Sequence, residues 1–129
     1  MKELVEKLKH IEQAISAEKG GFELFALFLR DDAPDKWDLV VSSDWARQNK
    51  KDSINYLVAT IRKEITKEEM LKLSRLVILD KDDAAMNALH SAMHVEHGMA
   101  EIRDSNFMGL AIKHAYLITS ARMKEQGDS

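Results

Sequence analysis

Three of the five histidines in this chain, His90, His94 and His97, lie within eight residues at spacings of four and three. On an ideal helix these steps hold three imidazoles within a sector of about 60°, so three neutral nitrogens could bind one ion. Three histidines with an open fourth position are a zinc arrangement that lowers the pKa of a bound water towards neutrality. Glu96 could then act as a base. One hypothesis is therefore a metal-dependent enzyme, such as a hydrolase, with zinc as its cofactor.

The cluster depends on one condition, that the helix beginning after Asp80 continues unbroken to His97. If residues 94–97 instead start a strand, alternation sends His94 and His97 to opposite faces. Ligands at catalytic metal sites also tend to converge from more than one element, with further acceptors that fix their tautomers. Metal binding is therefore the alternative hypothesis, and otherwise no cofactor is expected.

Three aspartates, Asp35, Asp38 and Asp80, form a second candidate group. Residues 37–41, Trp-Asp-Leu-Val-Val, resemble the aspartate-bearing strand of the nucleotidyltransferases, and this resemblance implies carboxylates that hold metal ions. It covers only these few residues. Leu-Arg-Asp-Asp at 29–32 stands where that family has a Gly-Ser turn, and the paired aspartates are three apart, which does not aim both to one side of a strand. A turn at Asp35 and a helix cap at Asp80 explain the same residues.

His114 and Tyr116 are two apart on a predicted strand, so they share a face and could form an acid–base pair. Apolar residues of the same parity surround them: Met108, Leu110, Ile112 and Ile118. The alternative is that both rings fill space in the core while their polar atoms find partners. Trp37 and Trp45, which flank the second predicted strand, are expected to be packing anchors or interface residues.

Several classes of function lack their motifs. The chain has no Walker-type loop, no glycine-rich dinucleotide turn, no Gly-x-Ser-x-Gly elbow and no His-Glu-x-x-His. The absence of cysteine excludes thiolate nucleophiles, disulfides and iron–sulfur clusters, and it fits a reducing compartment. The N-terminus lacks the apolar core of a secretory signal, and no apolar run approaches the roughly 20 residues of a membrane span. We expect a soluble, cytoplasmic protein with no membrane contact.

Length and charge indicate one ordinary globular unit. The 129 residues fit one domain, expected over 1–123, with a polar and frayed tail at 124–129. Residues 46–75 carry eight basic and four acidic side chains, whereas residues 1–45 carry six basic and ten acidic ones. A solvated helix face explains this mildly basic segment, and contact of 47–75 with nucleic acid is disfavoured because clustered cations on a known reading motif are missing.

Apolar residues at helical spacing predict the helices. Residues 2–19 carry an apolar stripe at steps of three and four, and Gly20 follows as a stop. Thr66 and Glu69 match a capping box, which marks a further helix start. The predicted helices are 2–19, 50–65, 67–73 and 81–97.

Alternation and turn residues predict five strands. The run 22–29 is apolar at both parities, which is typical of an interior strand covered on both faces. Residues 76–79 are expected to form another buried strand, and residues 104–106 to turn between the last two strands. The predicted strands are 22–30, 36–42, 75–80, 98–104 and 107–119.

These elements predict an α+β fold with a mixed, mostly antiparallel five-stranded sheet and helices packed on it. The short link after 22–30 favours a hairpin, and the helical link between 36–42 and 75–80 allows a parallel crossover. Two strands, 22–29 and 107–119, are apolar enough to favour self-association in so short a chain. The preferred interpretation is a protein that acts mainly through protein–protein contacts, as a homodimer and with an unknown protein partner.

Overall fold

A computed structural model of the chain describes residues 1–30, 35–107 and 110–122. Within these residues it contains five helices and one five-stranded sheet in the order β3-β2-β1-β5-β4, which confirms the α+β prediction. The strands are β1 Leu24–Arg30, β2 Trp37–Ser42, β3 Leu73–Ile78, β4 Ala100–Phe107 and β5 Leu110–Ser120. The helices are α1 Lys2–Lys19, α2 Asp44–Gln48, α3 Lys50–Glu64, α4 Lys67–Lys72 and α5 Ala84–Ala92. None of the described helices is long and apolar enough to cross a membrane.

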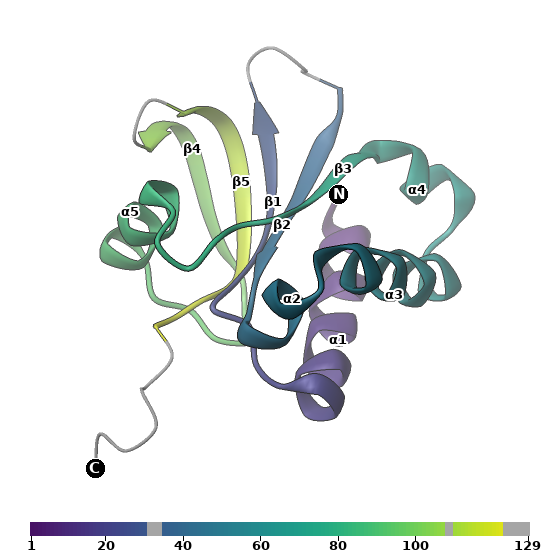
Figure 1. Cartoon of the computed structure of the whole chain (residues 1–129). Helices are drawn as coiled ribbons and strands as arrows, with labels where there is room; N and C mark the ends of the chain where they lie inside the picture. The colour runs from purple at the N-terminus through teal and green to yellow at the C-terminus, as the bar shows by residue number, and fades with distance from the viewer. Residues whose placement is uncertain (31–34, 108–109, 123–129) are drawn as a thin grey trace.

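The sheet is built around β1, which pairs antiparallel with β2 on one side and with β5 on the other. β4 continues the sheet antiparallel to β5, whereas β3 runs parallel to β2. The predicted hairpin and the predicted parallel arrangement of the second and third strands are therefore both confirmed. Figure 1 shows α1 and α3 together on one side of the sheet and α5 on the other.

Alternation along β1 explains why both faces of the sheet are covered. Phe25 and Leu27 belong to the larger core, which α1 and α3 complete, and we call this side the α1 face. Leu24 and Ala26 point the other way, into a smaller core that α5 completes with Met86, on the side we call the α5 face. A strand buried on both faces needs apolar residues at both parities, so the interior-strand prediction for 22–29 is confirmed.

Two helix predictions are confirmed in detail. The stripe of α1 is buried, and the helix ends before Gly20, whose φ of 119° lies in the region that favours glycine. At the start of α4 the capping box is complete: Thr66 Oγ1 accepts from the N–H of Glu69, and Glu69 Oε1 accepts from the N–H of Thr66. The 50–65 helix is confirmed as α3, and the separate short helix α2 precedes it.

The helix predicted over 81–97 is wrong at its C-terminal end, since α5 stops at Ala92. The reason lies in the backbone of Val95, which exchanges two hydrogen bonds with Ser120, at 3.1 Å and 2.7 Å. A helix directs its backbone groups along its own axis and cannot offer such a pair. The helix also starts later than predicted, at Ala84, and Asp83 rather than Asp80 is its N-cap.

Two predictions for the last two strands are also wrong. The turn predicted at 104–106 is wrong because those residues belong to β4, and the link to β5 includes 108–109, outside the described residues. The single-parity pattern of the last strand is also broken by a register shift between β1 and β5. Ile112 therefore packs on the α5 face, whereas Tyr116 and Ile118 pack on the α1 face. Met108 lies outside the described residues.

Candidate functional site

The three clustered histidines have three different partners. His90, in the last turn of α5, donates from Nε2 to the carbonyl oxygen of Glu23 at 2.9 Å. His94 Nε2 lies 3.4 Å from a carboxylate oxygen of Glu96, on the surface. His97 Nδ1 lies 2.6 Å from Oε1 of Glu12, a residue of α1. Within the described residues no group of three or more histidines or carboxylates could hold a metal ion. The unbroken helix on which the cluster depended is absent.

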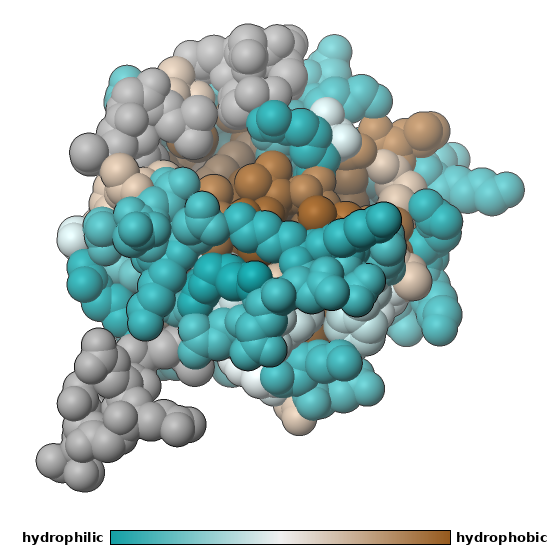
Figure 2. Space-filling view, in the orientation of Figure 1, coloured by the Kyte–Doolittle hydropathy of each residue, from teal (hydrophilic) through white to brown (hydrophobic). Residues whose placement is uncertain are grey.

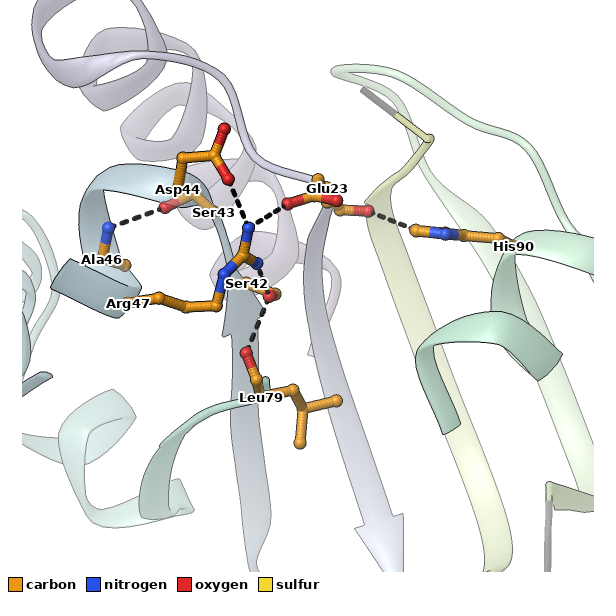
Figure 3. Close-up of polar contacts among 8 residues, drawn as sticks. All are labelled: Glu23, Ser42, Ser43, Asp44, Ala46, Arg47, Leu79 and His90. Carbon is orange, nitrogen blue, oxygen red and sulfur yellow. Dashed lines mark hydrogen bonds and ion pairs between the residues drawn. The ribbon is translucent and has the colours of Figure 1, made fainter. Parts of the chain in front are cut away.

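Glu23, whose carbonyl oxygen accepts the hydrogen bond from His90, belongs to a polar network at the end of the sheet (Figure 3). The guanidinium of Arg47, from α2, donates to carboxylates of Glu23 and Asp44 and to the hydroxyl of Ser42. Ser42 in turn donates to the carbonyl of Leu79, just after β3. The network therefore links residues at the ends of β1, β2 and β3 to α2. Its hydrogen-bond donors and acceptors bond to one another. We interpret it as a structural clamp, which sequence reasoning missed because its members are 24 and 37 residues apart.

The candidate aspartates do not converge either. Asp38 is buried in β2 and accepts from Arg75, with Nη2 and Oδ2 2.6 Å apart. Asp80 is exposed and pairs with Lys50 at 2.7 Å, and the hydrogen bond from that ammonium lowers the pKa of its carboxyl. Asp35 lies exposed in the link before β2. Asp38 and Asp80 are thus each held by a different basic residue, Arg75 and Lys50.

His114 and Tyr116 do share the α1 face, with ring centroids 4.6 Å apart, and both rings lie within 5.5 Å of the ring of Trp37. The Nε2 of His114 donates to Glu101 of β4, and this hydrogen bond lowers the pKa of the Glu101 carboxyl. Burial raises the pKa of the Tyr116 hydroxyl. A raised pKa makes the phenol a weaker acid and leaves less phenolate to act as a base. The cluster fits aromatic packing with a hydrogen bond from His114 to Glu101, and Trp37 is a packing anchor, as predicted.

The feature that remains open is the outer edge of β3. No other described strand pairs with that edge, because β3 is the last strand of the sheet. Leu79 donates its N–H to the carbonyl of Val41 in β2. Successive residues of a strand direct their N–H and C=O to opposite sides, so Leu76 and Ile78 direct theirs away from β2. The predicted burial of this strand is wrong, since most of β3 is only partly covered.

An apolar groove lies beside this edge on the α1 face. A cavity of about 110 Å³ is lined by side chains from α3, α4, β2 and β3, among them Val58, Met70, Leu73 and Leu76. A wider hollow of about 560 Å³ between α3 and α4 shares Met70 with it and is lined also by Arg62, Ile65, Lys67 and Leu71. We call the β3 edge and these two hollows the β3 groove. In the space-filling view, hydrophobic surface follows the line of β3 towards α4 (Figure 2).

Leu71 is the most exposed large apolar side chain among the described residues, at 69%. It stands beside Met70 on a helix of only six residues. Adjacent helical positions point about 100° apart, so when Met70 packs inward Leu71 must face outward. An apolar pair on a short charged helix is the sequence signal for this site, which the prediction from the sequence missed.

Neither the family models, nor the curated proteins, nor the solved structures contain a match to this chain. The assignment of function therefore depends on the geometry of the described residues.

The opposite edge of the sheet shows what a protected edge looks like. β4 carries charged side chains at Glu101, Arg103 and Asp104, and Asp104 has a φ of 48°. Charges and local distortion are devices by which proteins block pairing at an edge. β3 has the sequence Leu-Ser-Arg-Leu-Val-Ile and lacks such a distortion over Arg75–Ile78. The two edges thus differ in their capacity to accept another strand.

Proposed function

We propose that this protein is an interaction module that binds an extended, acidic and apolar segment of another protein along the β3 groove. The observation that carries the proposal is an edge of β3 that pairs with no other described strand and lies beside exposed apolar surface. Addition of a partner strand to a sheet edge gives affinity through main-chain hydrogen bonds and specificity through pockets for alternate side chains. Here the outward-facing N–H and C=O groups of β3 and an apolar pocket for side chains lie in neighbouring residues.

The backbone of the groove sets the position of the added strand. Leu76 and Ile78 supply N–H and C=O groups that pair with none of the described strands. These residues are two apart, which is the spacing that a partner strand matches. Alternate side chains of that strand would face Leu73 and Leu76 on the α1 face, where the smaller cavity lies. The partner therefore needs apolar residues at every second position.

Charge favours an acidic partner over a second copy of this chain. Arg62 and Lys67 line the wider hollow, and neither has an ion-pair partner among the described residues. Arg75 lies on β3 itself, where it pairs with Asp38 while its side chain stays 52% exposed. A two-fold contact between two β3 edges would bring these cations towards their own copies, since such an interface meets itself. Carboxylates on a partner would instead be attracted. The homodimer predicted from the sequence is the competing occupant.

The test uses a synthetic acetylated peptide in which valine alternates with glutamate. We expect it to bind the intact protein in fluorescence anisotropy, with an affinity that falls as salt is raised, because exposed charges are screened. A matched peptide with N-methyl groups on alternate amides lacks strand-pairing donors and should not bind. If the two peptides bind equally, the proposal of strand addition is wrong.

Leu71→Glu and Met99→Glu form a matched pair of variants for this test. Both residues are exposed, at 69% and 51%, so neither change should affect folding, but only Leu71 borders the β3 groove. We expect Leu71→Glu to weaken peptide binding by roughly tenfold, about 1.4 kcal/mol, and Met99→Glu to leave it unchanged. A two-chain mass in light scattering that Leu71→Glu reduces to one chain would assign the groove to a second copy instead.

A further inference from the structure

Glu12 is a fully buried carboxylate on the inner side of an otherwise apolar helix face. Its side chain is 0% exposed and lies among the residues of α1 that pack against the sheet. Its oxygens accept from the hydroxyl of Thr119 at 2.9 Å, from that of Ser16 at 3.2 Å and from Nδ1 of His97 at 2.6 Å. A buried carboxylate is costly unless it is well hydrogen-bonded. This one is satisfied, and the group that it holds is a histidine.

The segment that carries His97 is fixed by the end of β5. Val95 pairs with Ser120, the N–H of His97 donates to Thr119 Oγ1, and Gly98 donates to the carbonyl of Ile118. The backbone of His97 has a φ of 50°, a conformation that is unfavourable for non-glycine residues. Such strain persists only where the surroundings determine it. The position of the imidazole is therefore imposed from both α1 and β5.

The hydrogen bond with Glu12 also decides which nitrogen of His97 is available. A carboxylate accepts, so Nδ1 carries the proton and Nε2 carries the lone pair. The side chain is 44% exposed, and no other described residue contacts Nε2 through a hydrogen bond or ion pair. A carboxylate in this position fixes the tautomer and the orientation of the ring. Tautomer, orientation and access are all set in advance.

We propose that His97 and Glu12 form a nucleophilic dyad that accepts acyl groups from activated esters at Nε2, a site separate from the β3 groove. Nε2 attacks the carbonyl carbon, the ester C–O bond breaks, and the alcohol or phenol part leaves with the bonding electron pair. The Nδ1–H stays hydrogen-bonded to Glu12 as positive charge develops on the ring. Water then adds to the acyl carbon and the bond from that carbon to Nε2 breaks, with its electron pair returning to Nε2. The carboxylate leaves together with two protons, one of which an alkoxide leaving group can take up, and the neutral imidazole is restored. In this scheme Glu12 is a positioning residue.

A first experiment measures the reactivity of each histidine with diethyl pyrocarbonate, read by mass spectrometry of peptides. His10 is the internal control, because it is exposed on α1 and has no described partner. We expect modification of His97 to be at least fivefold faster than that of His10, although its ring is only half exposed. In Glu12→Gln the ratio should fall towards one. If His97 and His10 of the chain without substitutions react at equal rates, the proposal is overturned.

A second experiment uses p-nitrophenyl acetate. Release of p-nitrophenolate should exceed that caused by an equal concentration of free imidazole by about tenfold or more, a margin that corresponds to about 1.4 kcal/mol in barrier. His97→Gln should abolish the excess and His10→Gln should preserve it. An excess that survives His97→Gln means that another group reacts, and no excess at all means that the dyad is not an acyl acceptor.

A third experiment distinguishes a purely structural role of Glu12 from a positioning role. It determines which ring nitrogen of His97 carries the proton. Long-range ¹H–¹⁵N spectra distinguish an imidazole protonated at Nδ1 from one protonated at Nε2. We expect His97 to be protonated at Nδ1 alone, and Glu12→Gln to populate both tautomers while the remaining backbone signals keep their positions. If Nε2 carries the proton in the unmodified sequence, the lone pair faces Glu12 and the proposal fails. Should Glu12→Gln not fold, the first comparison between His97 and His10 still decides.

Discussion

Arg47 donates from Nη2 to Oε1 of Glu23 at 2.6 Å, and both side chains are nearly buried, at 13% and 7% exposure. The pair lies where β1 begins and where α2 follows β2, so it connects segments that the chain itself leaves 24 residues apart. Asp44 contacts the same guanidinium from the solvent side, at 71% exposure. One cation thus serves a buried and an exposed carboxylate, and the two contacts should differ in their effect on stability.

Arg47→Met is expected to lower the free energy of unfolding by about 3 kcal/mol, because it leaves the Glu23 carboxylate buried without its cation. Asp44→Asn removes the exposed partner and should change stability by less than about 1 kcal/mol. Urea unfolding followed by circular dichroism measures both. Similar losses in the two variants would show that burial of Glu23 has no such consequence.

Glu69→Gln tests a pH dependence. The hydrogen bond from Lys7, followed by that from the backbone N–H of Thr66, holds the pKa of Glu69 below its ordinary value of 4.5. Because the pKa is lowered by folding, the ionised carboxyl stabilises the protein above about pH 4.5, and this contribution is lost as pH falls through the folded-state value. Glutamine keeps an acceptor for the capping box but not the charge.

The stability difference between the unmodified chain and Glu69→Gln should therefore be largest at pH 7 and shrink towards pH 3. Urea midpoints at several pH values give the curve. Glu68→Gln, at an exposed neighbouring position of α4, is the control and should show a much flatter difference. A gap for Glu69→Gln that is constant down to pH 3 would contradict the assignment to Lys7.

The two tyrosines of the chain offer a spectroscopic prediction. Burial raises the pKa of both hydroxyls above 10.0. For Tyr56, the hydrogen bond to Glu18 raises the pKa further. At the usual midpoint, the absorbance of tyrosinate should thus be lower in the folded protein than in the unfolded chain. Glu18→Gln should bring the pKa of Tyr56 closer to its ordinary value, and Tyr56→Phe isolates the titration of Tyr116. A normal midpoint in Tyr56→Phe would argue against a buried Tyr116.

Asp104 tests the backbone of the β4 edge. At its φ of 48° a Cβ is unfavourable, so Asp104→Gly should be more stable than Asp104→Ala by about 1 kcal/mol. The order should be reversed at Arg103, one residue earlier, where the described backbone has no positive φ and glycine only adds entropy to the unfolded chain. Chemical denaturation of the four variants gives both differences. The same order at both positions would contradict the strained backbone.

The sequence was a good guide wherever a pattern was local. The stripe of α1, the capping box at Thr66 and the apolar run of β1 each depend on residues within one element, and all three elements form as expected. The hairpin of β1 and β2 is equally local. Local patterns contain no information about the pairing of Val95 with Ser120, which lies 25 residues later. This pairing prevents α5 from continuing to His97.

The candidate sites show the same division. His97 was identified by its spacing from other histidines, yet the residue that orients it is Glu12, 85 positions away and on a helix that reads as apolar on its inner side. The exposed edge of β3 was missed for a related reason. Residues 76–79 are as apolar as an interior strand, and only the strand order shows that β3 is the last strand of the sheet.

The central place of β1 has a consequence for the order of synthesis. β1 receives its first partner, β2, almost at once, but its other edge pairs with β5, so that Leu24 meets Ser120. A nascent chain that has emerged only as far as β4 exposes one side of its most apolar strand, and such an edge is a template for pairing with other chains. A fragment ending at residue 107 should aggregate where the whole chain stays dispersed, as sedimentation can show. Completion of the last strand is then the event that removes this hazard.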